Sequence, residues 1–239
     1  MIRIQRAGKT RRLGGKRVFL AASLLFANLS FATDRWKLDD PNGIVWNVAT
    51  DARLPHADQV EMSGRQISVI VHYGVGADRL LEYKREIFWP TLRSNHTDVR
   101  GYLHFEPAAA DEPVLRLEGR VMPPGPVQKI RFDGVLTIFF QPQHGILIAR
   151  NIFPVPDAPA VIERWTVRNE QKRSIRLSVD PIFDDQTVNT TRGPAHVGVT
   201  LRPPVRGRLA PGEARSFAVI TQAATFRHLS VNAKQAELR

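Results

Sequence analysis

The densest group of side chains able to do chemistry lies in the run 54–64, which reads LPHADQVEMSG. His56, Asp58 and Glu61 fall within six positions there, just before the first clear strand pattern. An imidazole and two carboxylates at this spacing can hold sugar hydroxyls through charge-assisted hydrogen bonds, or ligate a divalent metal. The spacing matches no known metal-ligand motif, so we expect no metal there. The alternative is that His56 and Asp58 only brace a loop.

A second acidic run, Asp180-Pro-Ile-Phe-Asp-Asp185, lies further along the chain. Asp184 and Asp185 lack the spacing of a calcium-binding EF-hand loop. Adjacent aspartates on one loop seldom face each other across a glycosidic bond, as a pair of catalytic carboxylates must. We therefore interpret this run as a solvated loop. With no G-x-S-x-G elbow, nucleotide-binding loop or HExxH motif in the sequence, we assign no catalytic residue and expect no cofactor.

Tryptophan and histidine are the remaining candidates for ligand contact. An exposed tryptophan could stack on a pyranose ring, and the chain has four: Trp36, Trp46, Trp89 and Trp165. Trp165 lies on an alternating apolar face and is expected in the core, whereas Trp89 stands before Pro90 at a strand end. The histidines other than His56 are dispersed along the sequence: His72, His96, His104, His144, His196 and His228.

Residues 1–32 have the composition of a secretory signal peptide. A basic region ends at Arg17, an apolar run covers 18–32, and Ser30-Phe31-Ala32 is a small-x-small cleavage signal. The run is shorter than the roughly 20 apolar residues of a membrane-spanning helix, and Asn28 interrupts it. We predict a secreted or periplasmic protein whose mature chain begins at Thr33 and has no membrane partner.

Charge and cysteine content exclude several classes of protein. The chain has 239 residues and a net charge of +11, but seven of its 34 basic residues lie in 1–32. The 27 that remain face 23 acidic residues, a balance that gives no support to nucleic-acid binding. The absence of cysteine excludes disulfides, thiolate metal sites and cysteine nucleophiles, so an ordinary core must supply the stability.

Short alternating segments dominate the rest of the sequence. They cover 67–73, 81–89, 135–140, 146–150, 161–169, 175–179 and 216–221. Turn-forming residues at 74–78 and 141–145 predict two hairpins. Glu163 is an exception, because it stands on the apolar side of its segment. No helical stripe is sustained, except in the last residues after Val231. We predict an all-β chain, with one antiparallel β-sandwich over 33–225.

Several segments then show a resemblance to a known family. They resemble the amino-terminal, supersandwich-like β-domain of bacterial exported six-hairpin, or (α/α)6-barrel, glycoside hydrolase-like proteins. The most specific of them is His-x-Asp-x-x-Glu-Met-Ser-Gly, at 56–64. The similarity extends from Trp36 to about Thr225. Its segments, in order, are 54–68, 70–75, 88–93, 131–137, 163–169 and 209–213.

The resemblance implies a sandwich followed by a helical barrel that holds the acid and base carboxylates. The chain stops at Arg239, so residues 226–239 are expected to begin a linker, and the chain alone is not expected to be active. His56, Asp58 and Glu61 become candidates for substrate binding or for the domain interface. Glu61 could instead pair with Arg65 or Arg93.

The function expected from the resemblance is that of a non-catalytic domain supporting or docking an (α/α)6 catalytic domain, in cis or as a separate chain. Its partners would be carbohydrate and that helical domain. The alternatives are a free-standing carbohydrate-binding module and a periplasmic interaction module. Docking predicts a large exposed apolar patch where the helical domain would sit, whereas sugar binding predicts an exposed aromatic platform.

Overall fold

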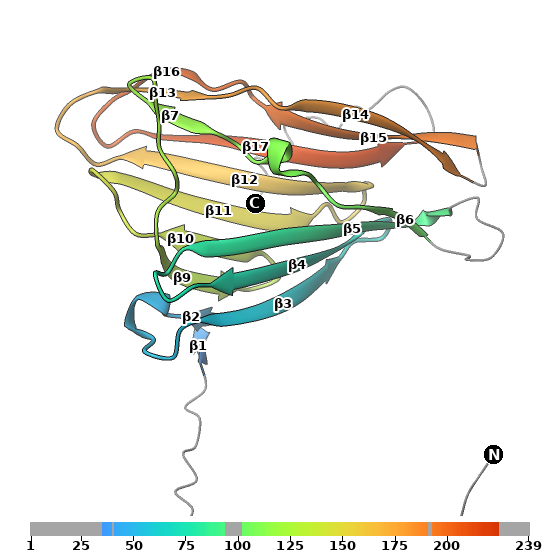
Figure 1. The fold of residues 1–239 in the computed structure, drawn as a ribbon, viewed down its shortest axis with the longest axis horizontal. Coiled ribbons are helices and arrows are strands. Elements are labelled where there is room, and N and C mark those ends of the chain that lie inside the picture. The colour runs from blue at the N-terminus through green and yellow to red at the C-terminus, as the bar shows by residue number, and fades with distance from the viewer. Residues whose placement is uncertain (1–34, 40, 94–101, 191–192, 225–239) are drawn as a thin grey trace, which may run out of the picture. The chain divides into compact units, whose positions relative to one another are not determined.

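The structure is a computed structural model that describes residues 35–39, 41–93, 102–190 and 193–224 (Figure 1). The predicted signal peptide, the linker at 226–239 and the helical residues after Val231 lie outside the described residues. The secondary structure of the described ranges is all β-strand, as predicted, apart from two short 3-10 turns, η1 (Val48–Thr50) and η2 (Ala109–Asp111). Within these ranges, no helix has the length and hydrophobicity needed to cross a membrane.

The largest sheet, called here the large sheet, has nine antiparallel strands in the order β1-β2-β9-β10-β11-β12-β17-β15-β14. In Figure 1 its strands run roughly along the longest axis of the fold. Their bounds, in sheet order, are β1 (Trp36–Asp39), β2 (Gly43–Trp46), β9 (Val127–Phe132), β10 (Leu136–Phe140), β11 (Ile146–Pro154), β12 (Ala160–Asn169), β17 (Ala214–Ala224), β15 (Gly193–Arg202) and β14 (Phe183–Thr190).

Two four-stranded antiparallel sheets complete the fold. The first, the β3–β6 sheet, comprises β3 (His56–Ser63), β4 (Ser68–Val75), β5 (Leu81–Arg93) and β6 (Tyr102–Phe105). The second has the order β16 (Arg206–Leu209), β13 (Ile175–Val179), β7 (Leu115–Leu117) and β8 (Arg120–Val121). Buried apolar side chains of all three sheets form one continuous core, among them Val71, Leu177 and Trp165. The two smaller sheets thus face the large one as the second layer of a sandwich.

The alternating patterns predicted seven of the 17 described strands, namely β4, β5, β10, β11, β12, β13 and β17. Val69, Val71 and Tyr73 are buried on β4, as expected for the inner face of a half-buried strand. The β4–β5 hairpin forms, but its turn lies at 76–80, where Gly76 N–H donates to the Leu80 carbonyl at 3.1 Å. The turn is therefore two residues later than predicted, because β4 stays paired through Val75.

The acidic run at 180–185 corrects our interpretation of a solvated loop. Asp184 and Asp185 lie in β14, which pairs with β15 along its whole length. This strand is at the edge of the large sheet, and most of its side chains are exposed. An edge strand with solvated faces needs no apolar alternation, so its polar sequence resembled that of a loop.

A second apolar cluster lies on the other side of the large sheet from the main core. We call it the outer cluster, and its six buried members are Phe153, Val155, Ala160, Ile162, Ala218 and Ile220. Ile162 pairs with Phe153 on β11 and with Ile220 on β17, so the cluster spans three adjacent strands. The described apolar residues packed against it, Val135 and Ala158, belong to hairpin turns of the same sheet.

Candidate functional site

The three predicted site residues all lie on β3, a strand where we expected a loop. The run pairs with β4 from His56 to Ser63, which makes it an edge strand of the β3–β6 sheet. Asp58 is opposite the buried Tyr73, and Glu61 is opposite Ile70. Because successive side chains alternate between faces, His56 and Asp58 share the inner face while Glu61 lies on the outer face. The structure therefore brings together only two of the three.

His56 and Asp58 form a polar brace at the edge of the core. His56 Nε2 lies 3.9 Å from Asp58 Oδ2, and the His56 ring meets the Trp46 ring edge-on at 5.3 Å. Burial and the nearby positive charge of Arg35 lower the pKa of His56, so its imidazole is neutral at pH 7. Burial raises the pKa of Tyr73, and its interaction with the Asp58 carboxylate raises it further. This arrangement braces the start of β3 against β2.

Asp51, which the sequence did not single out, organises the adjacent turn. Its carboxylate accepts hydrogen bonds from Arg35 Nε at 2.7 Å, Trp46 Nε1 at 2.9 Å and Arg53 N at 2.9 Å. Burial acts to raise the pKa of Asp51, but these donors together hold that pKa well below its usual range. Since Trp46 belongs to β2 and Asp51 comes shortly before β3, this carboxylate ties the two layers together.

Glu61 has only local partners on the outer face. Its Oε1 accepts a hydrogen bond from Ser68 Oγ at 3.0 Å. Arg65, which we considered as its partner, pairs instead with Asp157 at 3.2 Å, at the β11–β12 turn. The side chain of Arg93, the other partner considered, lies outside the described residues.

The exception in the β12 pattern, Glu163, is the centre of a buried ion network. Its carboxylate contacts Arg85 from β5 and Arg150 from β11, with Arg150 Nε at 2.9 Å. Both arginines also pair with Glu112, at 2.6 Å from Arg85 Nη2 and 3.1 Å from Arg150 Nη2. The network therefore places two positive and two negative charges at the interface between the β3–β6 sheet and the large sheet.

Aromatic rings complete this network. The Arg150 guanidinium lies 3.7 Å from the centre of the Tyr83 ring and 4.7 Å from that of Trp165. The Tyr83 hydroxyl donates to Glu163 Oε2 at 3.2 Å. Burial acts to raise the pKa of Glu112, but the two arginines hold it below its usual value, so the carboxylate stays charged. Every charge is paired, and the network fastens the two layers rather than offering a catalytic group.

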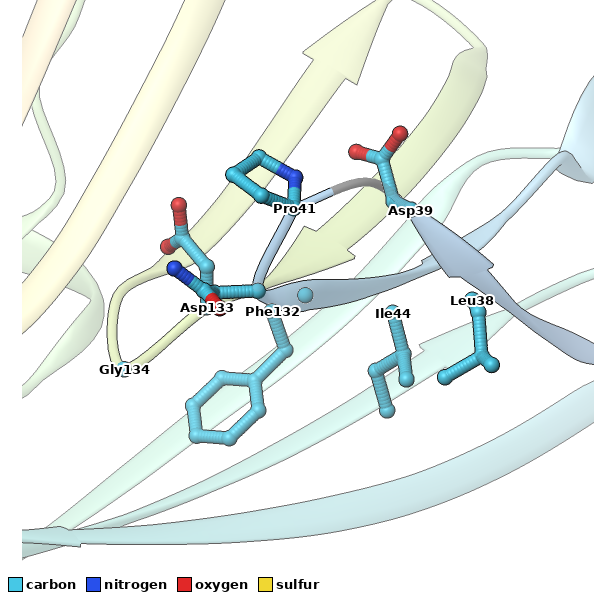
Figure 2. A pocket seen from close by; sticks show the side chains of 9 residues that line it. Leu38, Asp39, Pro41, Ile44, Phe132, Asp133 and Gly134 are labelled. Carbon is cyan, nitrogen blue, oxygen red and sulfur yellow. The ribbon is translucent and has the colours of Figure 1, made fainter.

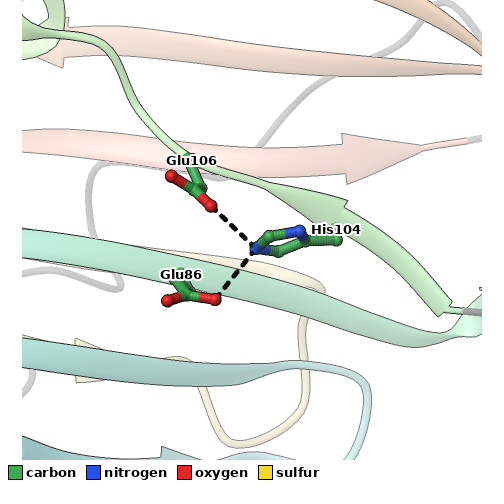
Figure 3. A group of neighbouring side chains, drawn as sticks. All are labelled: Glu86, His104 and Glu106. Carbon is green, nitrogen blue, oxygen red and sulfur yellow. Dashed lines mark ion pairs between the residues drawn. The ribbon is translucent and has the colours of Figure 1, made fainter.

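A separate cluster lies on the outer face of the β3–β6 sheet (Figure 3). His104 Nε2 is 3.3 Å from Glu86 Oε2 and 3.7 Å from Glu106 Oε1. His72 Nε2 contacts the other oxygen of Glu86 at 3.0 Å. Lys84 Nζ lies 3.1 Å from Glu106 and 3.4 Å from Glu86. Sequence reasoning missed this cluster, because strand register brings together residues that are dispersed along the chain.

The tryptophans offer no fully exposed platform, and all four lie in the described residues. Trp46, Trp89 and Trp165 are buried, and Trp36 is half-buried against Trp46 with ring centres 6.2 Å apart. Trp89 Nε1 donates to the Pro159 carbonyl at 2.9 Å, which satisfies its polar atom inside the core. The expected core position of Trp165 is confirmed.

An open apolar depression of about 600 Å³ lies at the β1–β2–β9 edge of the large sheet (Figure 2). Strand register aligns three apolar side chains across it, those of Leu38, Ile44 and Phe132. The carboxylates of Asp39 and Asp133 both pair with Arg131, at 2.6 and 3.1 Å. With its carboxylates engaged, the depression suits an apolar side chain better than a sugar.

Comparison with known proteins adds no relative: no protein-family model matches the chain, and no curated protein matches it.

Proposed function

We propose that this chain is the non-catalytic β-sandwich domain of an exported glycoside hydrolase-like protein. Its role is to support and dock a helical (α/α)6 catalytic domain, which belongs to the same polypeptide or to a separate chain. The proposal combines the sequence resemblance with one structural observation, the outer cluster of the large sheet.

The outer cluster has the composition of a packing surface. In a two-layer sandwich the apolar side chains belong on the faces that meet, and the outer faces are polar. Here β11, β12 and β17 are apolar on both faces over a short stretch: Val161 and Trp165 enter the main core, while Ile162 lies on the opposite face with Phe153.

Further along β12 that opposite face is polar, with Arg164 and Thr166. Full burial of such an apolar side chain contributes about 1.5–3 kcal/mol, and all six members of the cluster are already buried in the structure, so a docked domain would contact its half-buried margin, Val135 and Ala158, rather than fill an exposed patch.

The path of the chain is consistent with a domain docked at this face. β17 is the last strand described, and it ends at Ala224. Its side chains at Ala218 and Ile220 belong to the outer cluster. A helical domain joined after β17 would therefore begin beside the cluster, so a short linker would suffice to seat it there.

The carboxylates near one another in the structure support a non-catalytic role. A glycosidase places its two carboxyl groups on either side of a bound sugar. Glu163 is buried and held by two arginines. Glu86 and Glu106 lie together on the face of a sheet and share Lys84. Neither arrangement flanks a cleft.

The alternative of a free-standing carbohydrate-binding module is less well supported. Its expected platform would be an exposed aromatic surface. The large exposed aromatic side chains among the described residues are Tyr102 and Phe183. They lie on β6 and β14, edge strands of different sheets, so they do not form one platform.

The direct test is to sequence the genomic locus and its transcript beyond codon 239, together with the neighbouring genes. We expect a reading frame for a helical barrel, either continuing from this one, displaced by one base, or in an adjacent gene. A confirmed stop with no such frame at the locus would contradict the proposal, and saccharide binding by the chain would then be the assay to perform.

A further inference from the structure

We propose that Glu86, His104 and Glu106 form a binding site for a divalent transition-metal ion, best suited to Zn²⁺, on the outer face of the β3–β6 sheet. The site lies on the opposite layer from the outer cluster and does not depend on the proposed docking function. Figure 3 shows the three side chains converging from β5, from β6 and from the residue after β6.

The spacing of the donor atoms fits a tetrahedral ion. Ligands about 2.0–2.2 Å from zinc at tetrahedral angles are themselves roughly 3.4 Å apart. His104 Nε2 lies 3.3 Å from Glu86 Oε2 and 3.7 Å from Glu106 Oε1, and ligand atoms of the three residues all lie within 4.8 Å of one another. Small side-chain rotations would therefore place all three at bonding distance from one ion.

The donor types select among metals. An imidazole with two carboxylates suits Zn²⁺ and its neighbours in the first transition row. Calcium and magnesium prefer six or more oxygen ligands, which this cluster does not offer. Three protein ligands leave a fourth position open, as in zinc sites that bind a water molecule or a ligand.

Neighbouring side chains already orient two of the ligands. His72 Nε2 contacts Glu86 Oε1 at 3.0 Å, which turns the other oxygen of Glu86 toward His104. The Phe88 ring stacks on His104 with centres 4.6 Å apart and planes 8° from parallel. Such outer contacts fix the orientation of metal ligands and strengthen binding.

Lys84 is the group that a metal must displace. Its ammonium lies between Glu86 and Glu106, at 3.4 and 3.1 Å, and neutralises part of their charge. The Lys84 side chain is 53% exposed, so it can swing into solvent when a cation arrives. Removing its charge would leave the two carboxylates unneutralised, and so Lys84→Gln should strengthen metal binding.

The test is calorimetric titration of the whole, untagged chain with Zn²⁺ after treatment with a chelator. We expect one ion per chain. Affinity should fall at least about tenfold in His104→Ala and Glu86→Gln, and rise several-fold in Lys84→Gln. His144→Asn is the matched control, because His144 is exposed in the β10–β11 turn, and it should bind as the wild type does.

Titration with Co²⁺ provides a second readout, since a tetrahedral site containing nitrogen and oxygen ligands gives a strong visible absorption band. Circular dichroism establishes that each variant is folded. If His104→Ala does not fold, Glu106→Gln carries the test, since Glu106 is 45% exposed and outside the core. No saturable binding, or equal affinity in the wild type and the folded ligand variants, would overturn the proposal.

Discussion

The outer faces of the two layers differ in kind, although their inner faces share one core. On the large sheet, Ile162 and its neighbours make an outer face that is apolar and buried. On the β3–β6 sheet, the outer face carries half-buried Ile70 among histidine, lysine and glutamate side chains. The inner faces account for the fold. The outer faces differ: that of the large sheet is packed with apolar side chains, and that of the β3–β6 sheet carries the side chains that we propose bind an ion.

The same contrast occurs between two adjacent residues of β5. Arg85 enters the interior and pairs with Glu163, whereas Glu86 lies on the outer face between His72 and His104. Glu163 contacts two arginines, whereas Glu86 contacts two histidines and Lys84. Arginine keeps its charge and is suited to a permanent buried pair, while neutral histidine can ligate a metal. Residue type and burial together assign one cluster to stability and the other to binding.

The largest effect is expected from Glu163→Gln, which tests the interior that both outer faces share. The substitution leaves Arg85 and Arg150 with an uncompensated charge in the core, and should cost about 3–5 kcal/mol in the free energy of unfolding. Urea denaturation measures it. Glu170→Gln is the control, because Glu170 is exposed and its carboxylate makes only a long contact, at 4.0 Å, with Arg168. This variant should change the free energy of unfolding little. A loss below about 1 kcal/mol for Glu163→Gln would contradict the fastening role.

A matched pair of isoleucines compares the two outer faces directly. Ile162→Ala should cost about 2–5 kcal/mol because the side chain is fully buried, and Ile70→Ala, at a half-buried position, under about 1 kcal/mol. Chemical denaturation of both variants measures the difference. Equal losses would mean that the two faces are packed alike, and the contrast between them would be lost.

Asp51→Asn probes the link between the layers and should depend on pH. Removing the charge weakens hydrogen bonds from Arg35 and Trp46, at a cost of about 1–3 kcal/mol at pH 7. Because folding lowers the pKa of Asp51, its contribution is present above the usual carboxyl pKa near 4 and is lost as the pH falls below it. Thermal melts of the wild type and the variant should therefore converge in acid. A constant difference from neutral to acid pH would contradict this.

The smallest effect on stability is expected from Glu86→Gln. Without metal, this exchange on the outer face should change the free energy of unfolding by less than about 0.5 kcal/mol. The same variant should lose most of its affinity for Zn²⁺. If it instead destabilised the fold as much as Glu163→Gln does, Glu86 would belong to the structural interior and the comparison of the two carboxylates would fail.

The sequence predicted what depends on alternation along one strand. It located seven of the 17 described strands, and it marked Glu163 as an exception, which proved to be a buried carboxylate in an ion network. It could not predict pairings that depend on register between strands. His72, Glu86 and His104 meet only because β4, β5 and β6 align at particular offsets. The run 56–63 was missed as a strand because its edge position allows polar residues on both faces.

One binding measurement tests the central claim that the large sheet docks a helical domain. The helical domain encoded at the locus would be titrated with the wild-type chain, Ala158→Glu and His104→Ala, each confirmed to be folded; Ala158 is half-buried at the margin of the outer cluster and so is accessible to a docked domain. We expect binding to be weakened at least about tenfold by Ala158→Glu, which corresponds to about 1.4 kcal/mol, and unchanged by His104→Ala. Binding that is unchanged by Ala158→Glu would contradict the claim.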